Sequence, residues 1–236
     1  MRPLTLAYLS CFFPAYNEEE NLPALLDEVV ATIPALAQRW EAIVIDDGST
    51  DRTAEIVTEF ASRHPEIRLV RHPQNLGYGA ALRTGFIESR GDAVFFCDAD
   101  RQFRLAELDR LIAAFDDADM AIGYRIKRRD PWHRLVVAQV YHAALRVAFG
   151  LHVRDVDCAF KLIDRRMLDD FGGDLASRSA FISPELIIRA TRGGFRLREV
   201  GVDHFPRTAG KPKGASPKVI LRTISEMRRL RFSLPR

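Results

Sequence analysis

The chain has 236 residues, of which 47% are hydrophobic and 28% charged, with a net charge of +3, and this composition excludes a disordered or fibrous protein. Its three cysteines, Cys11, Cys97 and Cys158, are too few and too widely spaced for a disulfide framework or a zinc site, so we expect reduced thiols. No apolar run reaches the roughly 20 residues needed to span a bilayer.

Strand and helix patterns alternate from the start of the chain. The apolar run 6–13 predicts a buried strand, and aliphatic residues recur at helical spacing over 19–39, with Asn17 as the expected N-cap. Residues 42–46 predict a second strand, and Ser49 precedes a helix with one apolar face.

The alternation continues as far as residue 124. We expect further strands at 67–70, 93–97 and 119–124, a helix after Gly79 and another through 105–115. The strands are continuously apolar, which is typical of a mostly parallel sheet with helices on both faces. The predicted fold class is therefore α/β, with a Rossmann-like central sheet.

Four predicted strands each run into an acidic or glycine-rich loop. The loops are PAYNE (14–18), DDGS (46–49), NLGYG (75–79) and DAD (98–100). Any one of them could be a helix cap or a turn. Ligands of parallel sheets bind outside the carboxyl ends of the strands, so the four loops together predict one site at this edge.

The last of these loops places two carboxylates, Asp98 and Asp100, at the end of a buried strand. Such a pair is repulsive unless a cation lies between the two groups or one is protonated. Mg²⁺ and Mn²⁺ are typically held by one or two carboxylates together with substrate phosphates. The P-loop pattern is absent from the sequence, and no G-x-G-x-x-G follows the first strand, which argues against P-loop and dinucleotide-binding proteins.

Several segments together resemble the inverting glycosyltransferases of family 2. PAYNEEENL, VIDDGSTDRT, NLGYGAALRTGF and DADRQF have the order and spacing of that family, and DVDCAFKLIDRRML and PRTAGKPKGAS are similar to its dolichol-phosphate mannosyltransferase and polyprenyl-phosphate glycosyltransferase branch. The resemblance covers essentially the whole chain. It implies the glycosyltransferase A fold, with a catalytic domain at 1–206 and a basic loop and amphipathic helix at 207–236.

The resemblance implies metal-dependent, inverting transfer of a sugar from a UDP-, GDP- or dTDP-linked donor to a polyprenyl phosphate. A sugar or other hydroxyl acceptor is the alternative. A sugar-nucleotide pyrophosphorylase is a further alternative, against which the acidic loop after the first strand argues. A catalytically inactive membrane-surface module is the last, and it would usually have lost a metal carboxylate.

The resemblance also assigns residues to these roles. The donor would contact Pro14, Tyr16, Glu18, Asp46, Asp47, Gly77, Asp98 and Arg125. The Mg²⁺ or Mn²⁺ would be held by Asp98, Asp100 and Gln102, with Asp100 also counted as catalytic. The acceptor phosphate would meet Arg207, Lys211, Lys213, Ser216 and Lys218. Arg125 could instead be a surface arginine in a basic loop.

Asp157 is the catalytic candidate on the acceptor side, with Asp155 behind it. A lipid phosphate is already an anion near neutral pH, because its second pKa is about 6, and it needs little help from a general base. A hydroxyl acceptor would need a base within hydrogen-bond reach. Either aspartate could instead pair with Arg154 or cap a turn.

The end of the chain is basic. Residues 201–236 carry nine Lys and Arg and two acidic residues, a charge of +7 that leaves −4 on the rest. We expect this end to meet phosphates. Residues 218–232 predict a basic amphipathic helix that either lies on an anionic membrane or packs on the domain. We expect a cytoplasmic protein, peripheral on a membrane, with a homo-oligomer or a membrane-anchored partner subunit as options and no nucleic acid as partner.

Overall fold

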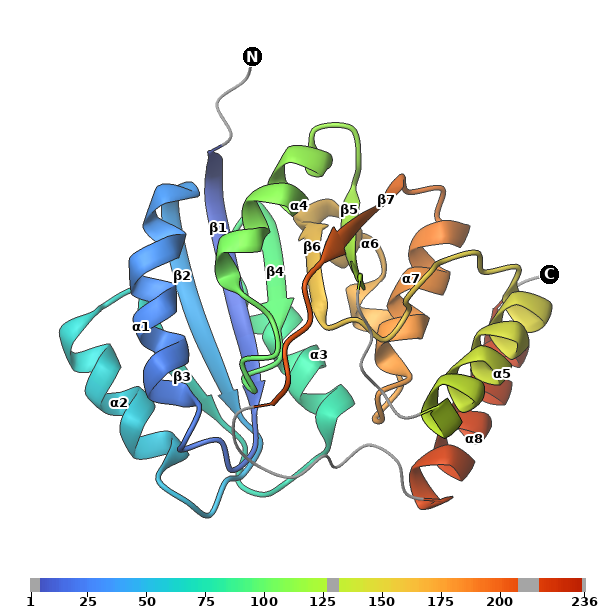
Figure 1. Ribbon diagram of the computed structural model, residues 1–236, viewed down its shortest axis with the longest axis horizontal. Helices are drawn as coiled ribbons and strands as arrows, with labels where there is room; N and C mark the ends of the chain where they lie inside the picture. The colour runs from blue at the N-terminus through green and yellow to red at the C-terminus, as the bar shows by residue number, and fades with distance from the viewer. Residues whose placement is uncertain (1–4, 127–131, 208–216, 235–236) are drawn as a thin grey trace.

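The computed structural model describes residues 5–126, 132–207 and 217–234 (Figure 1). Within these residues the strands form one seven-stranded sheet of order β3-β2-β1-β4-β6-β5-β7. The strands are β1 (Leu6–Ala15), β2 (Ala37–Asp46), β3 (Ile67–Arg71), β4 (Ala93–Cys97), β5 (Met120–Arg125), β6 (Phe160–Asp164) and β7 (Leu197–Val202). All five strands predicted from the sequence are present, and the mostly parallel α/β sheet is confirmed.

Helices cover both faces of the sheet (Figure 1). One face packs against α1 (Leu22–Thr32), α2 (Thr53–Arg63) and α4 (Leu108–Phe115), and the other against α3 (Tyr78–Glu88), α6 (Arg165–Phe171) and α7 (Ile182–Arg192). Alternate side chains of a strand point to opposite faces, so Phe13 joins the first core and Phe12 the second.

Two long helices lie at one end of the molecule, beside the second core (Figure 1). They are α5 (Trp132–Phe149) and α8 (Pro217–Ser233). Leu145 of α5 and Leu230 of α8 are buried in the second core, so both helices are attached to the body of the protein.

The predicted N-cap at Asn17 is wrong. α1 begins at Leu22, and Asn21 is its N-cap residue. Asn17 has a left-handed backbone with φ 54°, and its side-chain oxygen accepts a hydrogen bond from the Thr50 amide at 2.9 Å. Its carboxamide therefore joins two loops and does not cap the helix.

The predicted end of the first helix is also wrong. α1 ends at Thr32, and a short 3-10 turn, Ile33–Ala35, follows it. Pro34 has no amide hydrogen to continue the helix, and Ala37 is already paired with Leu6 of β1. Pairing with a buried strand thus overrides the helical spacing of the residues after Pro34.

Strands β6 and β7 are not predicted from the sequence pattern. β6 is antiparallel to both of its neighbours, β4 and β5, and it carries the fully buried Lys161, which interrupts the apolar pattern of a core strand. β7 lies at the sheet edge with Arg198 and Glu199 exposed, so it lacks the continuous apolar run of the central strands.

The contact between α3 and the sheet has no room for a side chain at Gly85. A Cβ added there would lie 2.2 Å from Phe12 Cδ2, and the Phe12 ring is fully buried between Phe86 and Phe96. Gly85→Ala should therefore lower the free energy of unfolding by about 1–3 kcal/mol, measured by urea denaturation.

The matched control is Gly173→Ala, because a Cβ at Gly173 would meet no atom within 4 Å. Its effect should stay within about 0.5 kcal/mol. If the two variants unfold at the same urea concentration, the packing of α3 described here is wrong.

Candidate active site

The candidate site lies at the edge of the sheet where β1, β2, β3 and β4 end. These strands are parallel, so the four loops predicted from the sequence leave the sheet at one edge. The antiparallel β6 begins there, since Phe160 pairs with Cys97 at the end of β4. β5 is antiparallel to β6 and parallel to β7, so β7 ends at this edge too. The topology thus adds the loop before β6 and the segment after β7 to the predicted set.

The loops after β1 and β2 are held together by their polar side chains. Ser49 Oγ accepts a hydrogen bond from the Asn17 amide at 2.9 Å, and Thr53 Oγ1 accepts one from the Glu18 amide at 2.9 Å. The rest of the predicted donor-binding stretch lies here as well: Pro14 is buried near the end of β1, and Tyr16 is half-buried in the loop.

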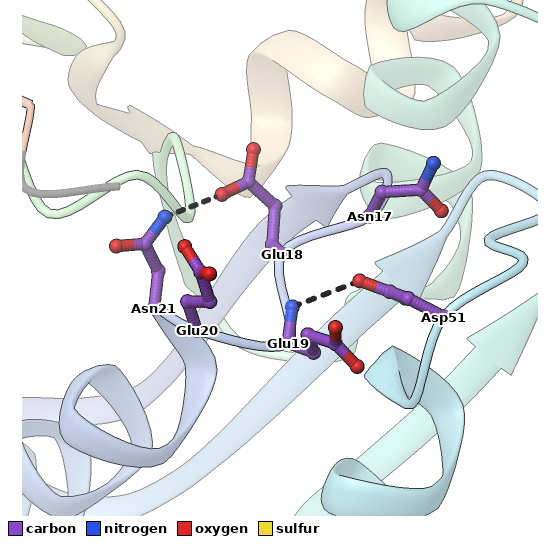
Figure 2. Close-up of a pocket in the computed structure, with 6 residues that line it drawn as sticks. All are labelled: Asn17, Glu18, Glu19, Glu20, Asn21 and Asp51. Carbon is purple, nitrogen blue, oxygen red and sulfur yellow. Dashed lines mark hydrogen bonds between the residues drawn. The ribbon is translucent and has the colours of Figure 1, made fainter. Parts of the chain in front are cut away.

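An acidic hollow of about 250 Å³ opens in this region, and Figure 2 shows it. It is lined by Asn17, Glu18, Glu19, Glu20, Asn21 and Asp51. Asp51 Oδ2 accepts from the Glu19 amide at 3.1 Å, and Glu18 Oε2 accepts from Asn21 Nδ2 at 2.6 Å. Four carboxylates repel phosphate and accept hydrogen bonds, so the hollow suits the hydroxyl- or NH-bearing part of a ligand.

Asp46 and Asp47 are both buried and both hold neighbouring loops. Asp46 Oδ1 accepts from the Ser49 amide at 2.8 Å, and Asp46 Oδ2 lies 3.0 Å from Arg71 Nε. Asp47 accepts from the amides of Leu76 and Gly77, each at 2.9 Å, and lies 2.7 Å from His72 Nδ1. The structure thus shows these carboxylates shaping the loops, and their contact with a nucleotide stays a prediction.

The glycine-rich loop after β3 presses against the loop before α7. Gly77 has φ 99°, and a Cβ on Gly79 would lie 2.5 Å from the carbonyl oxygen of Ser177. This close approach aims Tyr78 at the end of β4, where its hydroxyl donates to Asp98 Oδ1 at 2.8 Å. The loop therefore contacts the carboxylate pair through Tyr78, which the sequence analysis does not single out.

The carboxylate pair is compensated by groups from distant parts of the chain. Asp100 is 3% exposed, and its Oδ2 lies 2.6 Å from Arg207 Nη2. Arg207 Nη1 also lies 3.7 Å from Glu18 Oε1. Burial first, and the charge of Asp100 second, raise the pKa of Asp98 to about 7. The buried Asp100 and the half-buried Asp98 thus need positive charge or a proton beside them, as the sequence predicts.

The donor set fits a hard divalent cation that also binds phosphate. No group of three or more His, Cys, Asp or Glu in the described residues could enclose a metal by itself. Two carboxylates are the usual protein contribution to Mg²⁺ or Mn²⁺ that shares its other positions with phosphates and water. A guanidinium already lies against Asp100, so this place attracts cations.

Gln102 joins the carboxylate pair to the segment after β7. Its backbone amide donates to Asp100 Oδ1 at 3.1 Å, and its side-chain Nε2 donates to the Phe205 carbonyl at 3.2 Å. The Phe205 amide returns a hydrogen bond to the Gln102 carbonyl at 2.9 Å. Gln102 thus holds the segment that carries Arg207, and its predicted role as a metal ligand stays a prediction.

Arg125 at the end of β5 forms a two-pronged ion pair with Asp155. Its Nε and Nη2 lie 2.6 and 2.7 Å from the two carboxylate oxygens, and the pair is mostly buried. The alternative pairing of Asp155 with Arg154 is wrong, since Arg154 lies over the Tyr124 ring. Arg125 therefore fixes the loop before β6, and its contact with a phosphate stays a prediction.

Asp157 lies in that same loop, with its side chain open to solvent. Surrounding protein raises its pKa, first by desolvation and then through the charge of Asp155. The loop is held by the buried Lys161, whose Nζ donates to the carbonyls of Val156 and Cys158 in this loop. The same Nζ also donates to Ser183 Oγ at 2.7 Å. Asp157 thus combines an accessible carboxylate with a rigid support.

Lys161 is likewise not among the predicted site residues, although the sequence contains a signal for it. A lysine inside the apolar run AFKLI, at the start of a core strand, has to find partners in the interior.

Of the five predicted acceptor-phosphate residues, the structure places Arg207 against the carboxylate pair. Lys211, Lys213 and Ser216 lie outside the described residues, as does the side chain of Lys218. The predicted division of the chain at residues 206 and 207 stays a prediction.

Comparison with known proteins decides the family. A model described as "Glycosyl transferase family 2" matches residues 10–172. The chain belongs to this family. The family predicted from the sequence motifs is therefore confirmed.

Two curated relatives illustrate the branch. A dolichyl-phosphate beta-glucosyltransferase of Trichomonas vaginalis is 34% identical over 218 residues, which cover 83% of this chain and 63% of that protein. An undecaprenyl-phosphate 4-deoxy-4-formamido-L-arabinose transferase of Aeromonas hydrophila is 34% identical over 216 residues, covering 90% and 64%. The chain thus spans less than two thirds of the length of these relatives.

The fold is similar to that of glucosyl-3-phosphoglycerate synthase from Mycobacterium tuberculosis. Its complex with phosphoglyceric acid matches with a TM-score of 0.72 and 23% identity over 98% of this chain and 81% of that chain. Its complex with Mn²⁺, UDP and glucosyl-3-phosphoglycerate matches with a TM-score of 0.72 and 22% identity over the same shares. The predicted glycosyltransferase A fold is confirmed.

The ion pair of Arg125 and Asp155 generates a stability prediction. Arg125→Ala leaves the Asp155 carboxylate, which is 5% exposed, without its two-pronged partner and should lower the free energy of unfolding by about 3 kcal/mol in urea denaturation.

The neighbouring arginine supplies the control. Arg154→Ala removes only a contact with the Tyr124 ring and should cost at most about 1 kcal/mol. Equal losses in the two variants would show that the buried pair does not hold the loop before β6.

Proposed function

We propose that this protein transfers a sugar, with inversion, from a nucleotide sugar to a polyprenyl phosphate in a metal-dependent reaction. The observation that supports this most is the compensated pair Asp98 and Asp100 at the edge of the sheet, where Arg207 contacts Asp100 and approaches Glu18 of the acidic hollow. The relatives, a dolichyl-phosphate glucosyltransferase and an undecaprenyl-phosphate transferase, support the acceptor class.

In this proposal Asp98 and Asp100 hold Mg²⁺ or Mn²⁺ against the donor diphosphate. The Mn²⁺ and UDP bound to the M. tuberculosis synthase support a divalent ion and a nucleotide diphosphate. The bound ion would neutralise the charge that develops on the departing nucleoside diphosphate. Tyr78 orients Asp98, Arg207 offers a second positive charge to the phosphates, and the acidic hollow takes the hydroxyl-bearing nucleoside.

Asp157 positions the acceptor in this proposal. A phosphate monoester is already an anion near neutral pH and attacks without a strong general base. The carboxylate of Asp157, held by the Lys161-supported loop, is open to solvent and can order the acceptor and its counter-ions. A hydroxyl acceptor, deprotonated by Asp157, is the second candidate.

The face formed by α5 and α8 is proposed to lie on an anionic membrane. Large apolar side chains are exposed on both helices: Val140, Val147, Leu221, Ile224 and Phe232. Exposed arginines stand among them on α8: Arg222, Arg228, Arg229 and Arg231. Apolar side chains interleaved with cations suit a surface of anionic lipid. In the described part of the chain, no helix is both long and apolar enough to cross a bilayer.

The proposed reaction is tested by a turnover assay. UDP-, GDP- and dTDP-linked sugars are crossed with polyprenyl phosphate and with simple hydroxyl acceptors, with Mn²⁺, Mg²⁺ or EDTA. We expect transfer to polyprenyl phosphate that EDTA abolishes, and an inverted anomeric centre by NMR. Asp98→Asn should lower turnover by about 10²–10³-fold. Asp157→Asn should lower turnover and leave binding of the nucleotide unchanged.

The control is Asp27→Asn, an exposed carboxylate on α1, which should keep full activity. Transfer to hydroxyls alone would favour the second candidate. Formation of a nucleotide sugar from a sugar phosphate would favour a pyrophosphorylase. Failure to bind any of the three nucleotides would favour an inactive membrane-surface module.

Membrane binding is tested by flotation with vesicles. Replacing Arg228, Arg229 and Arg231 by glutamine should lower partitioning onto anionic vesicles by roughly ten- to a hundredfold, since each cation contributes about 1 kcal/mol near such a surface. Three exposed arginines elsewhere, Arg63, Arg90 and Arg198, make the charge-matched control, which should still float. Equal flotation of both triple variants would contradict the proposed face.

A further inference from the structure

Glu226 connects α8 to the loop before α7. Glu226 Oε1 accepts a hydrogen bond from the Arg178 amide at 3.0 Å, and Glu226 Oε2 accepts one from the Ser179 hydroxyl. The Glu226 side chain is 11% exposed. It is the only acidic residue of α8, and the loop it reaches lies 47 residues earlier in the chain.

The loop that Glu226 holds is itself packed on the glycine-rich loop after β3. The Gly79 amide donates to the Arg178 carbonyl at 3.1 Å. A Cβ on Gly79 would lie 2.5 Å from the Ser177 carbonyl oxygen, so the two backbones touch with no side chain between them. A shift of residues 177–179 would therefore move the backbone around Tyr78.

Tyr78 carries this contact to the carboxylate pair. Its hydroxyl donates to Asp98 Oδ1 at 2.8 Å, and its ring packs against the second core. An unbroken series of hydrogen bonds and backbone contacts thus runs from Glu226 through residues 177–179 and Gly79 to Tyr78 and Asp98.

We infer that Glu226 is a positioning residue for the nucleotide site. It holds residues 177–179 against the glycine-rich loop, and so fixes the Tyr78 hydroxyl on Asp98. The inference rests on the proposed function, in which Asp98 helps to bind the metal and the donor diphosphate. The two hydrogen bonds accepted by Glu226 carry the effect, whereas its charge forms an ion pair with Arg222, whose Nε lies 3.4 Å away.

The test separates the hydrogen bonds from the charge. Binding of UDP, GDP and dTDP with Mn²⁺ to the full chain is measured by calorimetry, beside urea denaturation of every variant. Glu226→Ala should raise the Kd of the nucleotide that wild type binds by about tenfold. Glu226→Gln keeps an oxygen for the Arg178 amide and an NH₂ for Ser179 Oγ, and it should bind within about threefold of wild type.

Two further variants act at the ends of the contact. Arg222→Ala removes the ion pair alone and should leave the Kd unchanged. Ser179→Ala should weaken binding, and the double variant Ser179→Ala/Glu226→Ala should be no weaker than Glu226→Ala, because both changes break one connection.

The outcomes distinguish failure of the positioning role of Glu226 from failure of the proposed function. If wild type binds none of the nucleotides, the proposed function fails and the inference fails with it. If wild type binds and Glu226→Ala binds equally well, or if Glu226→Gln is as weak as Glu226→Ala, only the positioning role is overturned. A loss of stability without a change in Kd would likewise show a merely structural residue.

Discussion

The structure of the site depends on two carboxylates that end one buried strand. Asp98 and Asp100 repel each other in a place that water reaches poorly, and this arrangement is stable only when positive charge or a proton compensates it. The compensation comes from far along the chain, as the Tyr78 hydroxyl and the Arg207 guanidinium. Each of these groups is brought there by its own loop, and those loops are held in turn by Asp47, Gln102 and residues 177–179.

The sheet topology explains why so many loops meet at this pair. A purely parallel sheet would bring only the ends of its strands to the edge. Because β6 is antiparallel, its beginning lies beside the end of β4, and the loop with Asp155 and Asp157 enters the site. β7 then ends at the same edge and delivers Arg207. The reversed strand thus adds the loop with Asp157 to this edge, and the parallel strand β7 adds part of the charge compensation.

What the sequence could predict followed from local chemistry. Apolar runs that end in Asp46, Asp98 and Asp100 locate strand ends, and parallel strands bring those ends together, so the carboxylate cluster was predictable. The partners of these carboxylates were not predictable. Nothing near Arg207 in the sequence indicates that it will contact Asp100, and nothing near Glu226 indicates that it will accept hydrogen bonds from residues 178 and 179. Asp155 shows the same limit: its partner is Arg125, 30 residues away, and not the adjacent Arg154 that sequence proximity suggests. The predicted end of the first helix was wrong because the pairing of Ala37 with β1 outweighed the helical spacing of the local apolar residues.

Arg207 links the carboxylate pair to the acidic hollow and to the proposed binding of the donor phosphates. Its guanidinium contacts Asp100 and approaches Glu18, so the segment after β7 is attached to both the carboxylate pair and the hollow. A guanidinium and a hard divalent cation would both be attracted to the Asp100 carboxylate, and a donor diphosphate would offer other acceptors to the guanidinium. In the proposed function Arg207 would thus contact the donor phosphate while Asp98 and Asp100 would hold the metal, which would supply the positive charge that the two carboxylates need. Arg207, at the start of the basic end, is thus tied to the acidic end of β4.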